Sequence, residues 1–182
     1  MIAPMALLLL YGQARTIPSE LPVGPLPTAF LSFCFSPDSR QVLYSKVDDA
    51  KNFDPQKRNI WIADADGSNA TIVTSGVGLA EWGKGRSIIY IKSTPTGNDL
   101  CTYDLDSKVE KSLGLKLAIR GAHYSTSANK LVFMADLGNR SAQVFTCSPE
   151  GTDVRQLTFG PGQAFNPIWS PDGKKIVFFR EL

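Results

Sequence analysis

Short runs of β-branched and aromatic residues, separated by polar and glycine-containing stretches, recur along the chain. The runs lie at 41–46, 59–63, 87–92, 130–134, 143–147 and 175–179, and helical patterning is nearly absent. Runs of four to eight such residues that are bounded by turn residues are typical of β-strands. The pattern therefore predicts an all-β fold, with folded sequence beginning near Phe30.

The strand pattern repeats. The stretch FSPDSRQVLYS at 35–45 returns as WSPDGKKIVFF at 169–179, and degenerate copies start at 82 (WGKGRSIIYIKS) and 124 (YSTSANKLVFMA). The aromatic residues that open these copies, here called anchors, are 47, 42 and 45 residues apart; they are Phe35, Trp82, Tyr124 and Trp169. A four-stranded blade takes about 40–45 residues, so the period predicts a β-propeller built of four-stranded antiparallel blades.

Each repeat reads as a strand ending at the anchor, a polar turn, two strands joined by a loop, a tight turn and a fourth strand. In the first repeat the tight turn holds Asp64, Asp66 and Gly67, which a calcium loop would also contain. The spacing lacks the glycine and glutamate of an EF-hand, and in the third repeat Ser148 replaces Asp64 while Gly151 keeps the glycine. We therefore expect a two-residue hairpin turn and no metal.

The segments FSPDS, NIWIADADGSN and RQLTFGPGQAFNPIWSPDGKKIVF resemble the TolB-like, WD-repeat-like β-propeller repeat. The resemblance covers residues 30–182 and is weakest where Gly83, Lys84 and Gly85 replace the Ser-Pro-Asp turn. It implies the propeller fold but no single activity. Similar blades occur in periplasmic TolB proteins, in propellers that precede prolyl-oligopeptidase-type catalytic domains, and in some polysaccharide lyases.

The repeats amount to three blades and two strands of a fourth. Either residues 1–29 lend two strands to close a ring of about four blades, which their prolines disfavour, or the repeats are a partial propeller. Because an unpaired strand edge recruits other strands, we expect the partial propeller, with self-association through residues 175–180.

Composition narrows the choice of partners and location. Nineteen Lys and Arg against seventeen Asp and Glu leave no cluster able to neutralise a row of phosphates, so nucleic acid is not an expected partner. Cys34, Cys101 and Cys147 lack zinc-binding spacing and are interpreted as buried apolar residues. The apolar run at 5–11 is too short to span a bilayer. Residues 1–29 have two interpretations: a signal remnant followed by a Pro-rich linker, or a ragged start that carries no signal. The first predicts a periplasmic or secreted protein and the second a cytoplasmic one.

Recognisable catalytic motifs are missing, since the sequence has no GxSxG, no HExxH and no GxxxxGK that is followed by Ser or Thr, and His123 is its one histidine. His123 precedes one anchor as Glu81 precedes another, so both are candidates for the central channel, where they would bind a cation or move a proton. The alternative is that they lie between blades and bind backbone groups. We expect Trp61, Trp82 and Trp169 to pack in the interior or between blades.

The loop at 47–58 is the longest between the second and third strands of a repeat, and it is the candidate partner-binding site. Its candidate contact residues are Asp48, Asp49, Lys51, Phe53, Lys57 and Arg58. The expected function is a non-enzymatic scaffold that binds protein or peptide partners without a cofactor. The alternatives are the propeller portion of a prolyl-oligopeptidase-type serine hydrolase and a lyase-like enzyme that uses the channel.

Overall fold

The regular structure is entirely β. The computed structural model describes residues 29–47, 58–75, 77–95, 97–138 and 141–181, and no helix occurs in these ranges. The strands are β1 (Ala29–Phe35), β2 (Gln41–Val47), β3 (Arg58–Asp64), β4 (Thr71–Ser75), β5 (Val77–Trp82), β6 (Ser87–Thr94), β7 (Gly97–Asp104), β8 (Glu110–Ser112), β9 (Ala118–Ser125), β10 (Lys130–Asp136), β11 (Ala142–Cys147), β12 (Arg155–Gln156), β13 (Gln163–Trp169) and β14 (Ile176–Glu181). Each predicted run coincides with a strand to within two residues.

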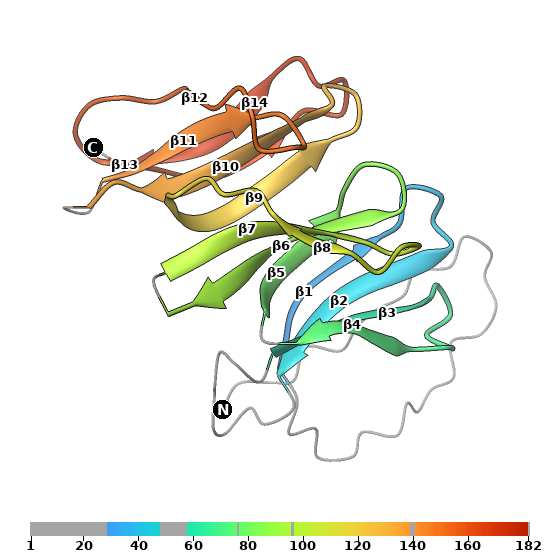
Figure 1. Ribbon diagram of the computed structural model, residues 1–182. Coiled ribbons are helices and arrows are strands. Elements are labelled where there is room, and N and C mark those ends of the chain that lie inside the picture. Colours follow the sequence, from blue (N-terminus) through green and yellow to red (C-terminus); the bar gives the residue numbers. More distant parts are fainter. Residues whose placement is uncertain (1–28, 48–57, 76, 96, 139–140, 182) are drawn as a thin grey trace, which may run out of the picture.

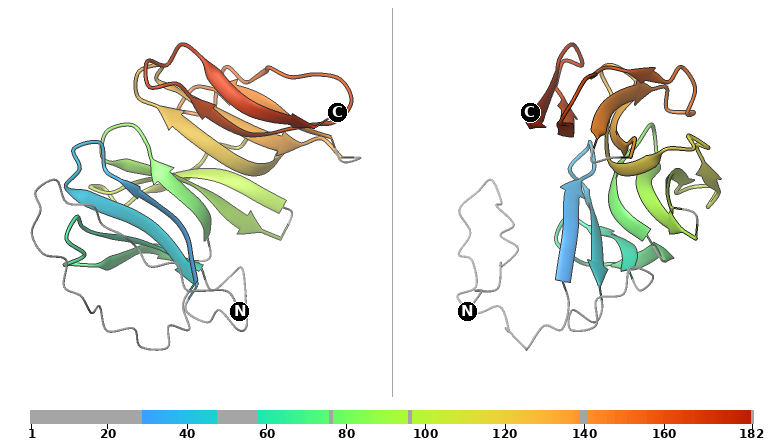
Figure 2. Two further views of the ribbon diagram at one scale, coloured as in Figure 1. Left: turned by 180° about the vertical axis from the view of Figure 1, so that it is seen from behind. Right: turned by 90° about the vertical axis from the view of Figure 1, so that its left-hand side faces the viewer.

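These strands form three four-stranded antiparallel sheets, β1–β4, β5–β8 and β9–β12, and a two-stranded sheet, β13–β14. The sheets follow one another along an arc, with β1–β4 and β13–β14 at its two ends (Figures 1 and 2). The prediction of a partial propeller with four-stranded blades is confirmed. The predicted N-terminal segment lies outside the described residues, apart from Ala29 at the start of β1.

The polar turn after an anchor is held by a local side-chain network. In the last repeat the Ser170 hydroxyl donates to the Asp172 carboxylate at 2.6 Å and accepts from the Lys175 N–H at 2.9 Å, while Gly173 has φ of 68°. The first repeat has the same bonds from Ser36, at 2.6 and 2.9 Å. Because all these partners lie within five residues, the Ser-Pro-Asp motif is enough to specify the turn.

The tight turn between β3 and β4 is a hairpin turn, but the prediction of a two-residue loop was wrong. The Asp64 N–H donates to the Ser68 carbonyl at 2.9 Å and the Gly67 N–H to the Asp64 carbonyl at 2.8 Å, which makes a three-residue loop. Gly67 alone of the Asp66-Gly67 pair has positive φ, at 85°. Asp66 accepts from the Ser68 N–H and hydroxyl, and Asp64 accepts from the Asn69 amide at 2.6 Å. Both carboxylates therefore stabilise the turn itself.

Apolar cores fill the spaces between successive sheets. The largest lies between β5–β8 and β9–β12, and its fully buried members include Leu100, Ile119, Leu131 and Phe133. Each such side chain contributes about 1.5–3 kcal/mol through removal of apolar area from water. The first strand of each sheet also packs against the first strand of the next, so β1, β5, β9 and β13 lie in sequence along the arc. The residues just before the anchors are carried by these four strands.

Candidate functional site: a cavity between the first strands

Three side chains placed just before an anchor reach the backbone of the next sheet from the first strand of their own sheet. The Cys34 thiol donates to the Ala80 carbonyl at 4.0 Å. Glu81 and His123 instead accept from the backbone N–H of the next sheet's anchor, and the pairs are Glu81 with Tyr124 and His123 with Trp169. The last pair joins the Trp169 N–H to the His123 Nδ1 at 3.2 Å. These side chains tie consecutive sheets together, as in the second of the two arrangements considered for Glu81 and His123. Both also line the cavity between the first strands, so their role in a central channel stays a prediction.

The protonation of Glu81 and His123 follows from their burial. Burial raises the pKa of the Glu81 carboxyl to about 7, although the hydrogen bond from the Tyr124 backbone opposes the change. Burial lowers the pKa of His123, and because its Nδ1 accepts a hydrogen bond, the neutral ring carries its proton on Nε2. At neutral pH the pair therefore consists of a carboxyl close to half ionised and an uncharged imidazole.

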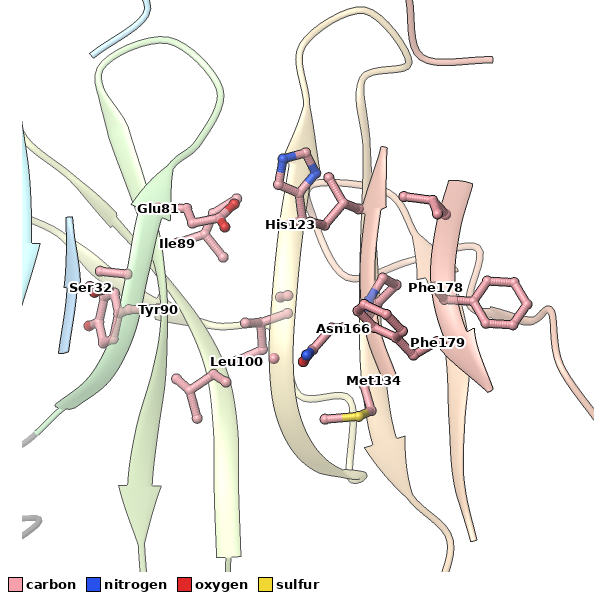
Figure 3. A pocket seen from close by; sticks show the side chains of 17 residues that line it. Ser32, Glu81, Ile89, Tyr90, Leu100, His123, Met134, Asn166, Phe178 and Phe179 are labelled. Atoms are coloured by element: carbon pink, nitrogen blue, oxygen red, sulfur yellow. The ribbon is translucent and has the colours of Figure 1, made fainter. Parts of the chain in front are cut away.

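A cavity of about 600 Å³ lies beside these two residues. Its described lining comes from all four sheets and is mostly apolar: Ser32, Ala80, Glu81, Ile89, Tyr90, Ile91, Leu100, Gly121, Ala122, His123, Met134, Asn166, Pro167, Ile168, Val177, Phe178 and Phe179. The Glu81 carboxylate points from β5 toward β9, which carries His123, and the Asn166 amide points into the same space (Figure 3).

The remaining candidate residues fall into two groups. Asp48, Asp49, Lys51, Phe53 and Lys57 lie outside the described residues. Arg58 begins β3, where it pairs with Val47. The predicted loop site at 47–58 therefore stays a prediction.

Neither metal nor thiol chemistry has support in the described residues. No group of three or more His, Cys, Asp or Glu residues is placed there to hold a metal ion. The three thiols are free. Cys101 and Cys147 are buried as predicted, and burial raises the pKa of these two to about 12; Cys34 is only half-buried, which corrects the prediction for it. Thiols with a raised pKa are poor nucleophiles.

No helix in the described part of the chain is long and apolar enough to cross a bilayer.

Two of the predicted tryptophans pack between sheets, as expected. Trp82 contributes to the core between the first two sheets, where its Nε1 donates to the Cys34 carbonyl at 3.4 Å, and Trp169 packs beside Ala164. Trp61 instead stacks on Tyr44 within the first sheet, at 6.2 Å between ring centroids.

Comparison with known proteins places the fold. No family model matches the chain. The structure of TolB from Acinetobacter baumannii superposes with a TM-score of 0.69 at 22% identity, over 82% of this chain and 37% of that one. The chain is built of TolB-like β-propeller blades. The structure of puromycin hydrolase also superposes, with a TM-score of 0.66 at 17% identity, over 84% of this chain and 25% of that one.

Two curated proteins match parts of the TolB-like chain. The Tol-Pal system protein TolB of Nitratidesulfovibrio vulgaris is 42% identical over 48 residues, which is 26% of this chain and 11% of that protein. The peptidase YuxL of Bacillus subtilis is 37% identical over 54 residues, 30% of this chain and 8% of that protein. The matched segments are about one blade long and span a small fraction of either relative.

Sequence reasoning found Glu81 and His123 but missed the third member of the series and the cavity. Cys34 precedes the anchor Phe35 as Glu81 precedes Trp82, so the repeat alignment already contained the signal. The cavity had no such signal, because Asn166 and Met134 come from different positions of their repeats.

Proposed function

We propose that the TolB-like blades form a non-enzymatic binding module for protein or peptide partners. The observation that carries the proposal is the cavity between the first strands. Its volume of about 600 Å³ falls within the range of small ligand sites, about 300–1,000 Å³, and its lining is apolar with a few polar groups. A peptide side chain of ordinary size fits such a space. Likeness to TolB supports the proposal at the level of fold.

Peptide selection tests the proposal. Random dodecapeptides displayed on phage are selected on the purified protein, and the enriched sequences are measured by fluorescence anisotropy. The Gly121→Leu variant fills the cavity, since a Cβ at Gly121 meets no atom within 4 Å. Ala118→Leu introduces the same side chain at an exposed position of the same strand and is the control.

We expect at least a tenfold loss of affinity in Gly121→Leu and parental affinity in Ala118→Leu. Failure to enrich any peptide above a surface coated with an unrelated protein would overturn the proposal. If Gly121→Leu binds the selected peptides as tightly as the parent does, the cavity is not the binding site. In that case charge reversals at Lys51, Lys57 and Arg58 would test the predicted loop site.

A second candidate is the propeller portion of a serine hydrolase, which the matches to a peptidase and to puromycin hydrolase favour. The encoding gene is read in frame beyond Leu182 for further blades and a GxSxG segment. If that segment is present, labelling of the longer protein by a fluorophosphonate would support the hydrolase over the scaffold. No observation favours the lyase-like alternative, because His123 Nδ1 already accepts a backbone hydrogen bond.

A periplasmic or secreted location is part of the same proposal. It rests on the interpretation of residues 1–29 and on likeness to TolB. Fusion of these residues to a reporter that folds only after export, such as alkaline phosphatase, tests it. An inactive fusion would favour the cytoplasmic alternative.

A further inference from the structure

In the part of its lining that the structure describes, the cavity contains one carboxyl group and no cationic side chain. Among the described residues that line it, none is Lys or Arg, and the other titratable groups are His123 and Tyr90. The Tyr90 hydroxyl donates a hydrogen bond to the Glu110 carboxylate, and burial raises the pKa of Tyr90, so its hydroxyl stays protonated and neutral. His123 is also neutral at physiological pH. Glu81 is therefore the source of charge in this space.

The surroundings leave the Glu81 carboxylate poorly compensated. The one group shown to stabilise its charged form is the Tyr124 backbone N–H. Cys34, which lies next to Glu81 across the sheet interface, has a pKa raised to about 11 and carries no charge. A carboxylate in an apolar site with a single hydrogen bond is costly, and a cation that enters the site offsets that cost.

We infer that the cavity binds an amine ligand, with its ammonium group on the Glu81 carboxylate and an apolar body against Ile89, Leu100 and Met134. An ammonium without an apolar body would lose hydration and gain no apolar contact. An apolar molecule without the ammonium would leave the carboxylate buried and unpaired. The Asn166 amide, which points into the cavity, offers a further hydrogen bond to such a ligand (Figure 3).

The amine site and the proposed function use the same cavity, and the inference rests on the proposed function only in using that cavity. The proposed partner is a protein or peptide, whereas the amine site requires no polypeptide. Peptides that enter the cavity through a lysine side chain or a free amino terminus would satisfy both. Peptides without an accessible amine would satisfy the proposed function alone.

Three probes of similar size separate charge from apolar contact: 2-phenylethylamine, 2-phenylethanol and 3-phenylpropionate. Their affinities are measured at pH 8 by NMR titration of the parent protein, of Glu81→Gln and of Glu150→Gln. Glu150 is an exposed carboxylate outside this cavity and gives the matched control. We expect the parent and Glu150→Gln to bind the amine at least tenfold more tightly than the alcohol, and the carboxylate most weakly.

In Glu81→Gln the preference of the amine over the alcohol should vanish while the alcohol still binds. In the parent the same preference should shrink below pH 6, where Glu81 is protonated and the amine is still cationic. This second readout holds even if the variant fails to fold. Equal binding of amine and alcohol by the parent at pH 8, or an amine preference that survives in Glu81→Gln, would overturn the inference.

The two proposals fail separately. Selected peptides that bind while none of the three probes does would refute the amine site and leave the scaffold. Amine binding through Glu81 without any enriched peptide would refute the scaffold and leave the amine site.

Discussion

Replacing Glu81 with glutamine should stabilise the protein at high pH and have little effect at low pH. The glutamine amide is nearly the same size and its oxygen still accepts from the Tyr124 N–H, so the change removes mainly the charge. At pH 8 the folded parent must hold an ionised carboxylate in the apolar space between β5 and β9. The variant has no such requirement.

The size of the effect follows from the pKa of Glu81. Its pKa is about 7 in the folded protein against an ordinary 4.5 in the unfolded chain, a difference worth at most about 3 kcal/mol. Between pH 4.5 and 7 the folded state binds more protons than the unfolded state, so stability falls as pH rises. His123 acts oppositely, because its lowered pKa removes stability as pH falls below 6.5. Comparing variant with parent cancels the histidine contribution.

Urea unfolding of the parent and of Glu81→Gln, followed by far-UV circular dichroism at pH 5 and pH 8, measures the difference. We expect the variant to gain up to about 3 kcal/mol at pH 8 and about 1 kcal/mol or less at pH 5. Glu150→Gln, at an exposed position, should change little at either pH. A Glu81→Gln variant that is less stable than the parent at pH 8, or a difference independent of pH, would refute the reasoning.

Four further predictions test other parts of the structure. Gly67→Ala should lower the free energy of unfolding in urea by about 1 kcal/mol, because a φ of 85° strains any residue with a Cβ. Gly151→Ala should cost more, since its Cβ would also lie 2.6 Å from the Leu113 carbonyl oxygen, just after β8. Equal costs for the two variants would contradict this reasoning. The Asp64→Asn variant and the parent should show no rise in melting temperature with calcium, since the carboxylates of this turn bind their own donors; a rise in the parent that the variant loses would restore the calcium loop. His123→Ala should lower stability by about 1 kcal/mol through loss of the hydrogen bond to the next sheet, yet leave any lyase or hydrolase activity intact; loss of such activity in a folded variant would support the channel enzyme instead. The 182-residue polypeptide should associate in light scattering, and Phe179→Lys should reduce this, because Phe179 is 63% exposed on the strand β14; a monomeric parent would refute self-association.

The outer strand of the last sheet, β14, shows how much the alternation of side chains along a strand can predict about packing. Phe178 and Phe179 point to opposite sides of β14, as a strand requires (Figure 3). Phe179 stacks on Phe165 at 5.7 Å between ring centroids, and this face, with Ile168 and Val177, is largely exposed. Alternation along the strand places the two phenylalanines on opposite faces, but it does not indicate which face packs.

Local chemistry made the strands, the repeat and the polar turns predictable from the sequence. The bonds of Ser170, Asp172 and Lys175 join residues at most five apart, so a short motif determines them in any fold that contains it. The error in the tight turn is of the same local kind. Asp66-Gly67 is compatible with both two- and three-residue loops, and the register of β3 and β4 decides between them.

The tertiary structure alone decided what surrounds Glu81. The sequence placed Glu81 and His123 at equivalent positions of neighbouring repeats, but their hydrogen bonds reach anchors more than forty residues away. The raised pKa of Glu81 depends on how closely β5 and β9 approach and on which apolar side chains exclude water there. Desolvation sums over all neighbours in space, whereas a sequence pattern records only neighbours along the chain. The cavity and its single carboxyl group therefore emerge only when the sheets are packed together.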